Sequence, residues 1–159
     1  MAVLKVRIFP DPILRKKALP VVKITEVEQR LIKDMIDTMY VVGGVGIAAN
    51  QVGVDKRIFI ASPEQEKGRE IIAVNPRIIE KSGRESLPEG CLSLPGIFAI
   101  RAQDSDGKDV VIHAEGLLAK IFQQEIDHLE GVLFIDHLGA IKRNMLLRKF
   151  RKLNKSRSA

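Results

Sequence analysis

The stretch Glu115 to Glu130, EGLLAKIFQQEIDHLE, says more about the fold than any other part of the sequence. Its apolar residues recur at helical spacing and Gly131 follows as a terminator, so the pattern predicts a helix over residues 115–130. The apolar positions are Leu117, Leu118, Ile121, Phe122, Ile126 and Leu129. The same helix carries a glutamine, a glutamate and a histidine within one turn and a half.

Short β-rich runs precede this helix, and helices lie beyond them on both sides. The predicted strands are residues 57–61, 71–74 and 110–112, with a weakly alternating edge strand at 3–9 and a short strand or turn at 133–135. Asn75-Pro76 is expected to end the second of these runs. The strands do not alternate with helices in βαβ fashion, which argues against a doubly wound sheet.

Two further long helices are predicted, one near each end of the chain. A capping box of Thr25 and Glu28 begins the first, over residues 25–40, and the second is amphipathic, over 141–154. Asp11 can cap a short helix through Leu14 and Arg15. The predicted fold class is therefore α+β: a single domain with short, mostly antiparallel strands around a central motif-bearing helix, plus a C-terminal helix.

The charge of the chain is concentrated at its C-terminal end. The 159 residues include 26 Lys and Arg against 20 Asp and Glu, a formal charge of +6. Eight of the basic residues and none of the acids lie from Lys142 onward, which leaves 18 basic and 20 acidic residues in the rest. We expect residues 1–140 to form the catalytic domain and 141–159 a basic helix and tail.

Composition excludes several classes of protein. A single cysteine allows no internal disulfide and favours a reducing compartment, which predicts a cytoplasmic protein. No stretch approaches the roughly 18 apolar residues of a membrane span. A near-neutral body without Trp and with one Tyr argues against a surface that wraps or stacks on nucleic acid, so no DNA partner is expected.

Three segments carry candidate chemistry: GVGIAANQ at 44–51, EGCLS at 89–93 and QEIDH at 124–128. The first allows close backbone approach at its small residues, although a glycine-rich turn would look the same. The second holds the only cysteine, which by itself is most often a small buried residue. In the third, positions 124 and 128 lie one turn apart on one helix face, but one histidine beside a glutamate means little alone.

The three segments together, in this order and spacing, resemble the peptide deformylase family. The resemblance extends from IFPDPILRKKA near the N-terminus through AVNP and the DGK turn to the basic final helix. It implies metal-dependent hydrolysis of the N-formyl group from the N-terminal formyl-methionine of nascent proteins. It also implies one divalent metal ion, expected to be Fe²⁺, with Zn²⁺, Ni²⁺ or Co²⁺ as alternatives.

The resemblance also assigns residues to roles. The metal ligands would be Cys91, His128 and, at the position of the family's first histidine, Gln124. The catalytic group would be Glu125 as proton acceptor and donor, Gln51 and the backbone N–H of Leu92 as oxyanion donors, and Gly46 in the first motif. Val45, Leu117 and Ile121 are the candidates for the pocket that binds the methionine side chain, although such residues equally suit an ordinary core.

Two departures from the family pattern stand out. Gln124 replaces a histidine, and an amide oxygen is a poorer ligand than imidazole for Fe²⁺ or Zn²⁺, so weaker metal binding and lower activity are expected. The segment after Gly96 is shorter than usual and lacks the Arg that would pair with Glu89. The alternative hypothesis is a non-catalytic peptide-binding or ribosome-associated protein on the same fold, and for either we expect the basic C-terminal helix to favour a phosphate-rich ribosomal surface.

Overall fold

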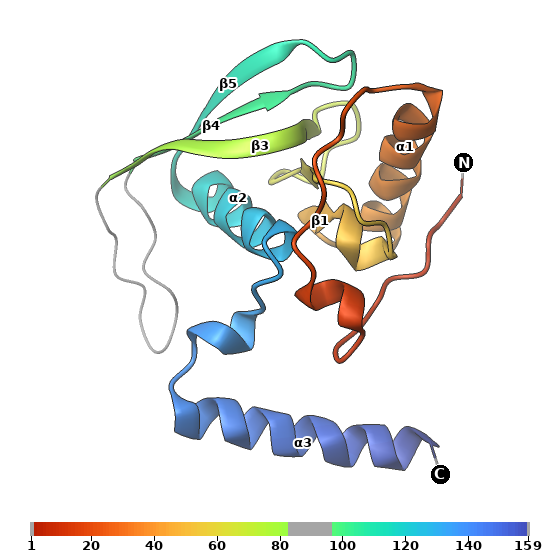
Figure 1. Ribbon diagram of the computed structural model, residues 1–159, viewed down its shortest axis with the longest axis vertical. Helices are drawn as coiled ribbons and strands as arrows, with labels where there is room; N and C mark the ends of the chain where they lie inside the picture. The colour runs from red at the N-terminus through yellow and green to blue at the C-terminus, as the bar shows by residue number, and fades with distance from the viewer. Residues whose placement is uncertain (1, 83–96, 159) are drawn as a thin grey trace.

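A five-stranded antiparallel sheet forms the central layer of the computed structural model, which describes residues 2–82 and 97–158 (Figure 1). The strands are β1 (Gly46–Ala48), β2 (Ile58–Ala61), β3 (Ile71–Ser82), β4 (Ile97–Gln103) and β5 (Asp109–Ala114). Each strand pairs with its neighbour in the chain, in the order β1-β2-β3-β4-β5. The glycine-rich segment therefore supplies an edge strand of the sheet.

Helices cover the sheet at β2 on both faces, which explains why that strand is apolar without alternation. Phe59 and Ala61 of β2 belong to the core beneath α2 (Gly116–Leu129), whereas Ile58 and Ile60 belong to the core beneath α1 (Glu26–Val41). All four residues of β2 are buried. In the α2 core, the Phe122 ring packs edge-on against Phe59 at 5.3 Å and Phe98 at 6.5 Å between centroids.

The remaining elements are short 3₁₀ helices and one long helix. They are η1 (Pro12–Arg15), η2 (Ala49–Val52), η3 (Phe134–His137) and α3 (Ala140–Ser158). Figure 1 shows α3 set apart from the sheet, joined to α2 through η3. Its described contacts include an edge-on pair between Phe150 and Phe9 of the N-terminal segment, with ring centroids 5.3 Å apart. In the part of the chain that the structure describes, no helix has the length and apolarity to cross a bilayer.

The α+β class is confirmed, as are all three long helices and the cap of η1 by Asp11, whose Oδ1 accepts from the N–H of Ile13 at 3.1 Å. The capping box of Thr25 and Glu28 is also present at the start of α1. The strand predicted at residues 3–9 is wrong, because that segment has no regular hydrogen-bonded partner strand in the described chain. Residues 133–135 lead into η3 rather than forming a strand.

The prediction that Asn75-Pro76 ends a strand is wrong as well. Strand β3 continues to Ser82. A register shift between Val74 and Arg77 accommodates Pro76, which has no N–H to donate to the sheet. Asn75 adopts a left-handed backbone with φ of 54°, and its side chain bonds both backbone groups of Val21. The bulge is thereby tied to the N-terminal segment.

The capping box of α1 predicts an acid-dependent contribution to stability. Lys56 Nζ donates to Glu28 Oε1 at 2.6 Å, and this bond, with those from Thr25, lowers the pKa of Glu28 to about 2. The charged form therefore stabilises the fold above the ordinary pKa of 4.5, and this contribution disappears as the pH falls from 4.5 towards 2. We expect Glu28→Gln to lower the free energy of unfolding by about 1 kcal/mol at pH 7 and by a clearly smaller amount at pH 2.5, where the contribution of the charged pair is already mostly lost.

Urea unfolding at the two pH values measures this difference. Glu26→Gln is the matched control, since Glu26 lies in the same first turn and is exposed. An equal loss for Glu28→Gln at both pH values would contradict the assignment to the charged pair.

Candidate active site

Helix α2 presents a buried carboxylate at the middle of the fold. Glu125 is 5% exposed, and its Oε2 atom has no hydrogen-bond partner among the described residues. Burial raises the pKa of Glu125 to about 8, because the charged form loses its hydration. A buried carboxyl whose pKa lies near neutrality can both accept and release a proton, and such groups occur mostly at functional sites.

The glycine-rich edge strand lies directly against this carboxylate. A Cβ atom placed on Gly46 would lie 2.7 Å from Glu125 Oε1 and 2.9 Å from Ile121 Cγ2. Any larger residue at position 46 would force the side chains of Glu125 and Ile121 to move. The structure therefore brings the first and third sequence segments into contact, as their joint assignment to one site requires.

The 3₁₀ helix η2 fixes two amides of the first segment beside α2. Asn50 is buried, and its Nδ2 atom donates to the backbone carbonyl of His128. Gln51 is oriented by its own turn, since its Oε1 accepts from the N–H of Ala48 at 2.8 Å. This bond directs the amide nitrogen of Gln51 to act as the donating end.

Asn50 lies within the first segment, but the sequence pattern predicts no role for it. A polar amide between Ala49 and Gln51, in a run otherwise small and apolar, was the available signal. Its burial requires a partner, and the carbonyl of His128 is that partner. Asn50 therefore ties the first segment to the helix turn that carries the imidazole.

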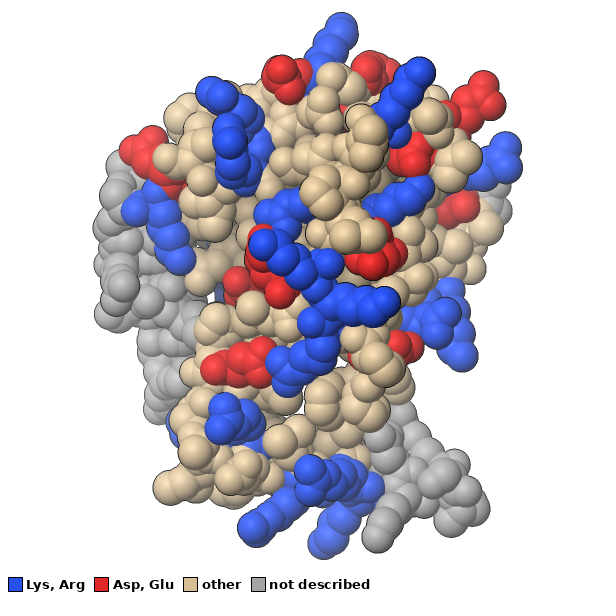
Figure 2. Space-filling model, in the orientation of Figure 1, with Lys and Arg blue, Asp and Glu red and all other residues tan. Residues whose placement is uncertain are grey.

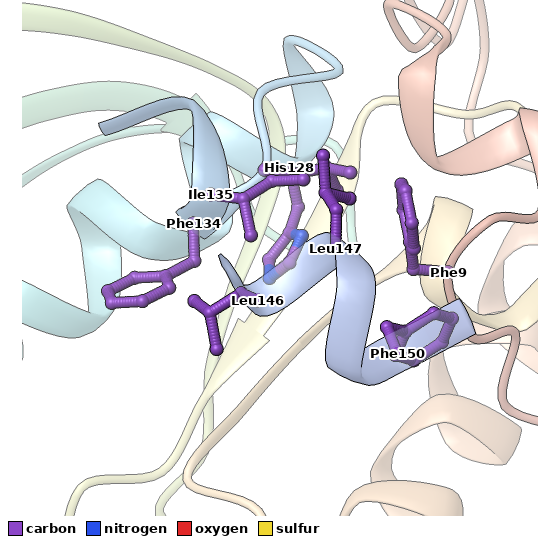
Figure 3. A pocket seen from close by; sticks show the side chains of 8 residues that line it. Phe9, His128, Phe134, Ile135, Leu146, Leu147 and Phe150 are labelled. Carbon is purple, nitrogen blue, oxygen red and sulfur yellow. The ribbon is translucent and has the colours of Figure 1, made fainter. Parts of the chain in front are cut away.

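His128 lies between two hollows at the C-terminal end of α2. One, of about 320 Å³, is apolar and lies between η3, α3 and Phe9, as Figure 3 shows. The other, of about 300 Å³, is also lined by Gln124, which is exposed, and by Asp127 and His137. The Nδ1 atom of His128 is buried and has no partner among the described residues, and burial lowers the pKa of the imidazole. The neutral form, which binds metals, is thereby favoured.

The described residues fit a metal in part. Within residues 2–82 and 97–158, no group of three His, Cys, Asp or Glu side chains lies close enough to hold an ion. His128 supplies one imidazole, and Gln124 one turn earlier lines the same hollow with an amide. A third ligand must therefore come from elsewhere, and the predicted Cys91 lies outside the described residues, as does Leu92.

The three candidates for the methionine pocket differ in their surroundings. Ile121 is 1% exposed within the core beneath α2, and Val45 packs against the same core while half-buried. Leu117, one turn before Ile121, is 55% exposed. Val45 and Leu117 thus have surface to offer a ligand, whereas Ile121 supports Gly46 from below. Of the other two histidines, His113 lies on β5, and His137 Nε2 lies 3.0 Å from Asp127 Oδ2.

The close contact between Gly46 and Glu125 predicts that a larger residue at position 46 destabilises the fold. We expect Gly46→Ala to lower the free energy of unfolding by about 1–3 kcal/mol, because the new methyl overlaps Glu125 and Ile121 in a packed interior. Chemical unfolding of the variant measures the loss. Gly139→Ala is the control, since its Cβ would meet nothing within 4 Å. Equal stability of the two variants would contradict the close packing of β1 on α2.

A helix-borne carboxylate and imidazole beside a glycine-rich edge strand and an oriented amide are the parts of a metal-dependent amide hydrolase. The comparisons with known proteins define this class more closely. The family model of polypeptide deformylase matches residues 3–144, and the chain belongs to that family. It is a metal-dependent hydrolase of the peptide deformylase type, which removes the N-formyl group from the formyl-methionine of new proteins.

Relatives of known name cover nearly all of the chain. Peptide deformylase 2 of Xanthomonas axonopodis is 43% identical, with 98% of each chain aligned, and peptide deformylase of Rhizobium meliloti is 42% identical over 96% of this chain and 94% of its own. The crystal structure of a peptide deformylase from Legionella pneumophila is 39% identical and superposes with a TM-score of 0.90, covering 99% of this chain and 98% of that one. These similarities support the enzyme over the non-catalytic alternative.

Proposed function

We propose that Glu125 is the residue that moves the proton in deformylation by this chain. Hydrolysis of the formyl amide needs a group that takes a proton from water as the carbon–oxygen bond forms and gives it to the leaving amine as the carbon–nitrogen bond breaks. The observation that carries the proposal is the buried Oε2 of Glu125, which has no hydrogen-bond partner within residues 2–82 and 97–158, together with a pKa raised to about 8. One carboxyl near neutrality serves both transfers, and formate and a free amine are the products.

The oxyanion that develops on the formyl oxygen needs donors already in place. We assign this role to the side-chain amide of Gln51 and the backbone N–H of Leu92. The bond from Ala48 to Gln51 Oε1 supports the first assignment, because it leaves the NH₂ end of the amide to donate. The half-buried Val45 and the exposed Leu117 are proposed to bind the methionine side chain, together with the buried Ile121.

His128, Gln124 and Cys91 are the proposed metal ligands, and Fe²⁺ is the proposed ion. When bound, a divalent metal lowers the pKa of water and polarises the formyl group. The half-buried imidazole of His128, whose pKa burial lowers, suits this role, as does the position of Gln124 one turn away on the same hollow. A thiolate and Fe²⁺ both oxidise readily, so a reducing cytoplasm is the proposed location.

Turnover of a formyl-methionyl peptide by the purified chain loaded with Fe²⁺ or Ni²⁺ tests the proposal. The expected result is formate release that needs metal and stops on chelation. Metal content measured on the same sample separates a chain that binds no metal from one that binds metal and does not react. Stoichiometric metal without formate release would contradict the proposed function.

The basic helix α3 is proposed to contact the ribosome, from which formylated chains emerge. Figure 2 shows its Lys and Arg side chains together at the lower end of the molecule, whereas acidic and basic side chains mix over the body. The helix contains no acid to offset its charge. Such a surface gains affinity for phosphates by releasing counterions. The division into 1–140 and 141–159 remains a prediction.

We expect replacement of four exposed basic residues of α3 by Gln to lower co-sedimentation with ribosomes at low salt by about tenfold. The positions are Lys142, Arg148, Lys149 and Arg151. Deleting the helix is a poorer test, because Leu146, Leu147 and Phe150 line the hollow beside His128. Formyl-peptide turnover should stay unchanged in the charge variant. Unchanged co-sedimentation would contradict the ribosome contact.

A further inference from the structure

We propose that Gln65 is a positioning residue, which fixes the backbone of residues 43–45 where it enters the active-site edge strand. Gln65 lies in the loop between β2 and β3. The proposal rests on the proposed function for its kinetic consequence, but its structural part stands on hydrogen bonds alone.

One turn of this loop donates hydrogen bonds to the carbonyl groups of three consecutive residues, 43–45. Gln65 Nε2 donates to the carbonyl oxygens of Gly43 at 3.0 Å and Gly44 at 3.3 Å. The N–H of Ser62 donates to the carbonyl of Val45 at 2.7 Å. The next residue, Gly46, is the one that lies against Glu125. The turn Ser62–Gln65 therefore fixes the chain immediately before the catalytic contact.

The turn itself is held in place from α1. The hydroxyl of Tyr40 lies 3.1 Å from Ser62 Oγ and donates to Glu70 Oε1 at 2.6 Å. Glu70 Oε1 also accepts from the N–H of Gly68 at 3.0 Å. Both ends of the loop are thus tied to one tyrosine at the last turn of α1 (Glu26–Val41).

Glutamine occupies position 65 although the backbone conformation there is unfavourable for it, which indicates that its side chain is what the position requires. Its φ of 51° is left-handed, a conformation that glycine or asparagine adopts at lower cost. Asparagine is one methylene shorter and would not reach both carbonyls from the same backbone. The glutamine accepts an unfavourable backbone and supplies two bonds to a segment that contains two glycines.

For the enzyme, the role proposed for Gln65 affects the binding of the peptide and not the chemical step. Gly43 and Gly44 leave the approach to β1 flexible, and the amide of Gln65 removes that freedom before a peptide binds. Glu125 and His128 are not touched by Gln65 and keep their positions on α2. Loss of the amide should therefore raise KM and leave kcat nearly unchanged.

Gln65→Gly and Gln65→Asn test the proposal in the full-length chain. Both variants suit the left-handed backbone but lose the two bonds, so the expected result is amide exchange at residues 45–48 that is about tenfold faster than in the parent chain. For formyl-methionyl peptides, KM should rise about fivefold with kcat within about twofold. Glu66→Gly adds the same backbone freedom one residue later and should leave both quantities at parent values.

Parent-like exchange at 45–48 in Gln65→Gly would overturn the proposal, as would a fall in kcat with KM unchanged. The exchange measurement needs no turnover. A parent chain that holds metal without releasing formate would therefore refute the proposed function, while the exchange rates would still decide the role of Gln65.

Discussion

Gln124→His should raise the affinity of the chain for Fe²⁺ or Zn²⁺ by about 100-fold and formyl-peptide turnover with it. Gln124 lies one helical turn before His128 and lines the same hollow, so an imidazole at this position would join that of His128 on one face. An imidazole nitrogen is a stronger ligand for these ions than a neutral amide oxygen. Because Gln124 is exposed, the larger ring needs no repacking of the core.

Metal titration followed by isothermal calorimetry measures the affinity, and formate release at saturating metal measures the turnover. Gln123→His is the matched control, since it makes the same change one residue earlier on another helix face. Equal metal affinity in the parent chain and Gln124→His would show that position 124 is not a ligand. His137→Gln in the parent chain tests whether the neighbouring imidazole substitutes for the missing one.

The fold was largely predictable where the spacing of apolar residues shows which face of a helix or strand is buried. The helix periodicity around Glu125 and the capping box at Thr25 reflect local geometry, and both appear as expected. Strand β3 was mispredicted because Pro76 is tolerated only through a bulge, and that bulge depends on bonds from Asn75 to Val21, far away in the chain. No local window contains that information.

The residue types of the site were predictable from the sequence, but the contacts by which those residues hold one another in place were not. The contact of Gly46 with Glu125 follows from the pairing of distant segments, and so does the bond from Asn50 to His128. A sequence motif names such residues without saying which face each side chain occupies. Ile121 shows the difference, because its helical position suits a pocket and the structure places it in the core.

Glu125→Gln should lower kcat for formyl-peptide hydrolysis by about 10³-fold while the chain stays folded and keeps its metal. The amide has the size of the carboxyl but cannot take up a proton from water. Burial already holds the pKa of Glu125 at about 8, so the folded protein gains nothing from a charge at this position. The free energy of unfolding of the variant at pH 8 should therefore equal or exceed that of the parent chain.

Steady-state kinetics, metal content and urea unfolding of the same preparation separate the three effects. Glu115→Gln is the matched control: it removes a carboxylate at the exposed N-terminal end of α2, where the side chain makes no capping bond. Its turnover should match the parent chain. Activity in Glu125→Gln above about a tenth of the parent value would rule out Glu125 as the proton carrier. A loss of stability in that variant would contradict the raised pKa, because it would mean that the carboxylate is charged and stabilised in the folded enzyme.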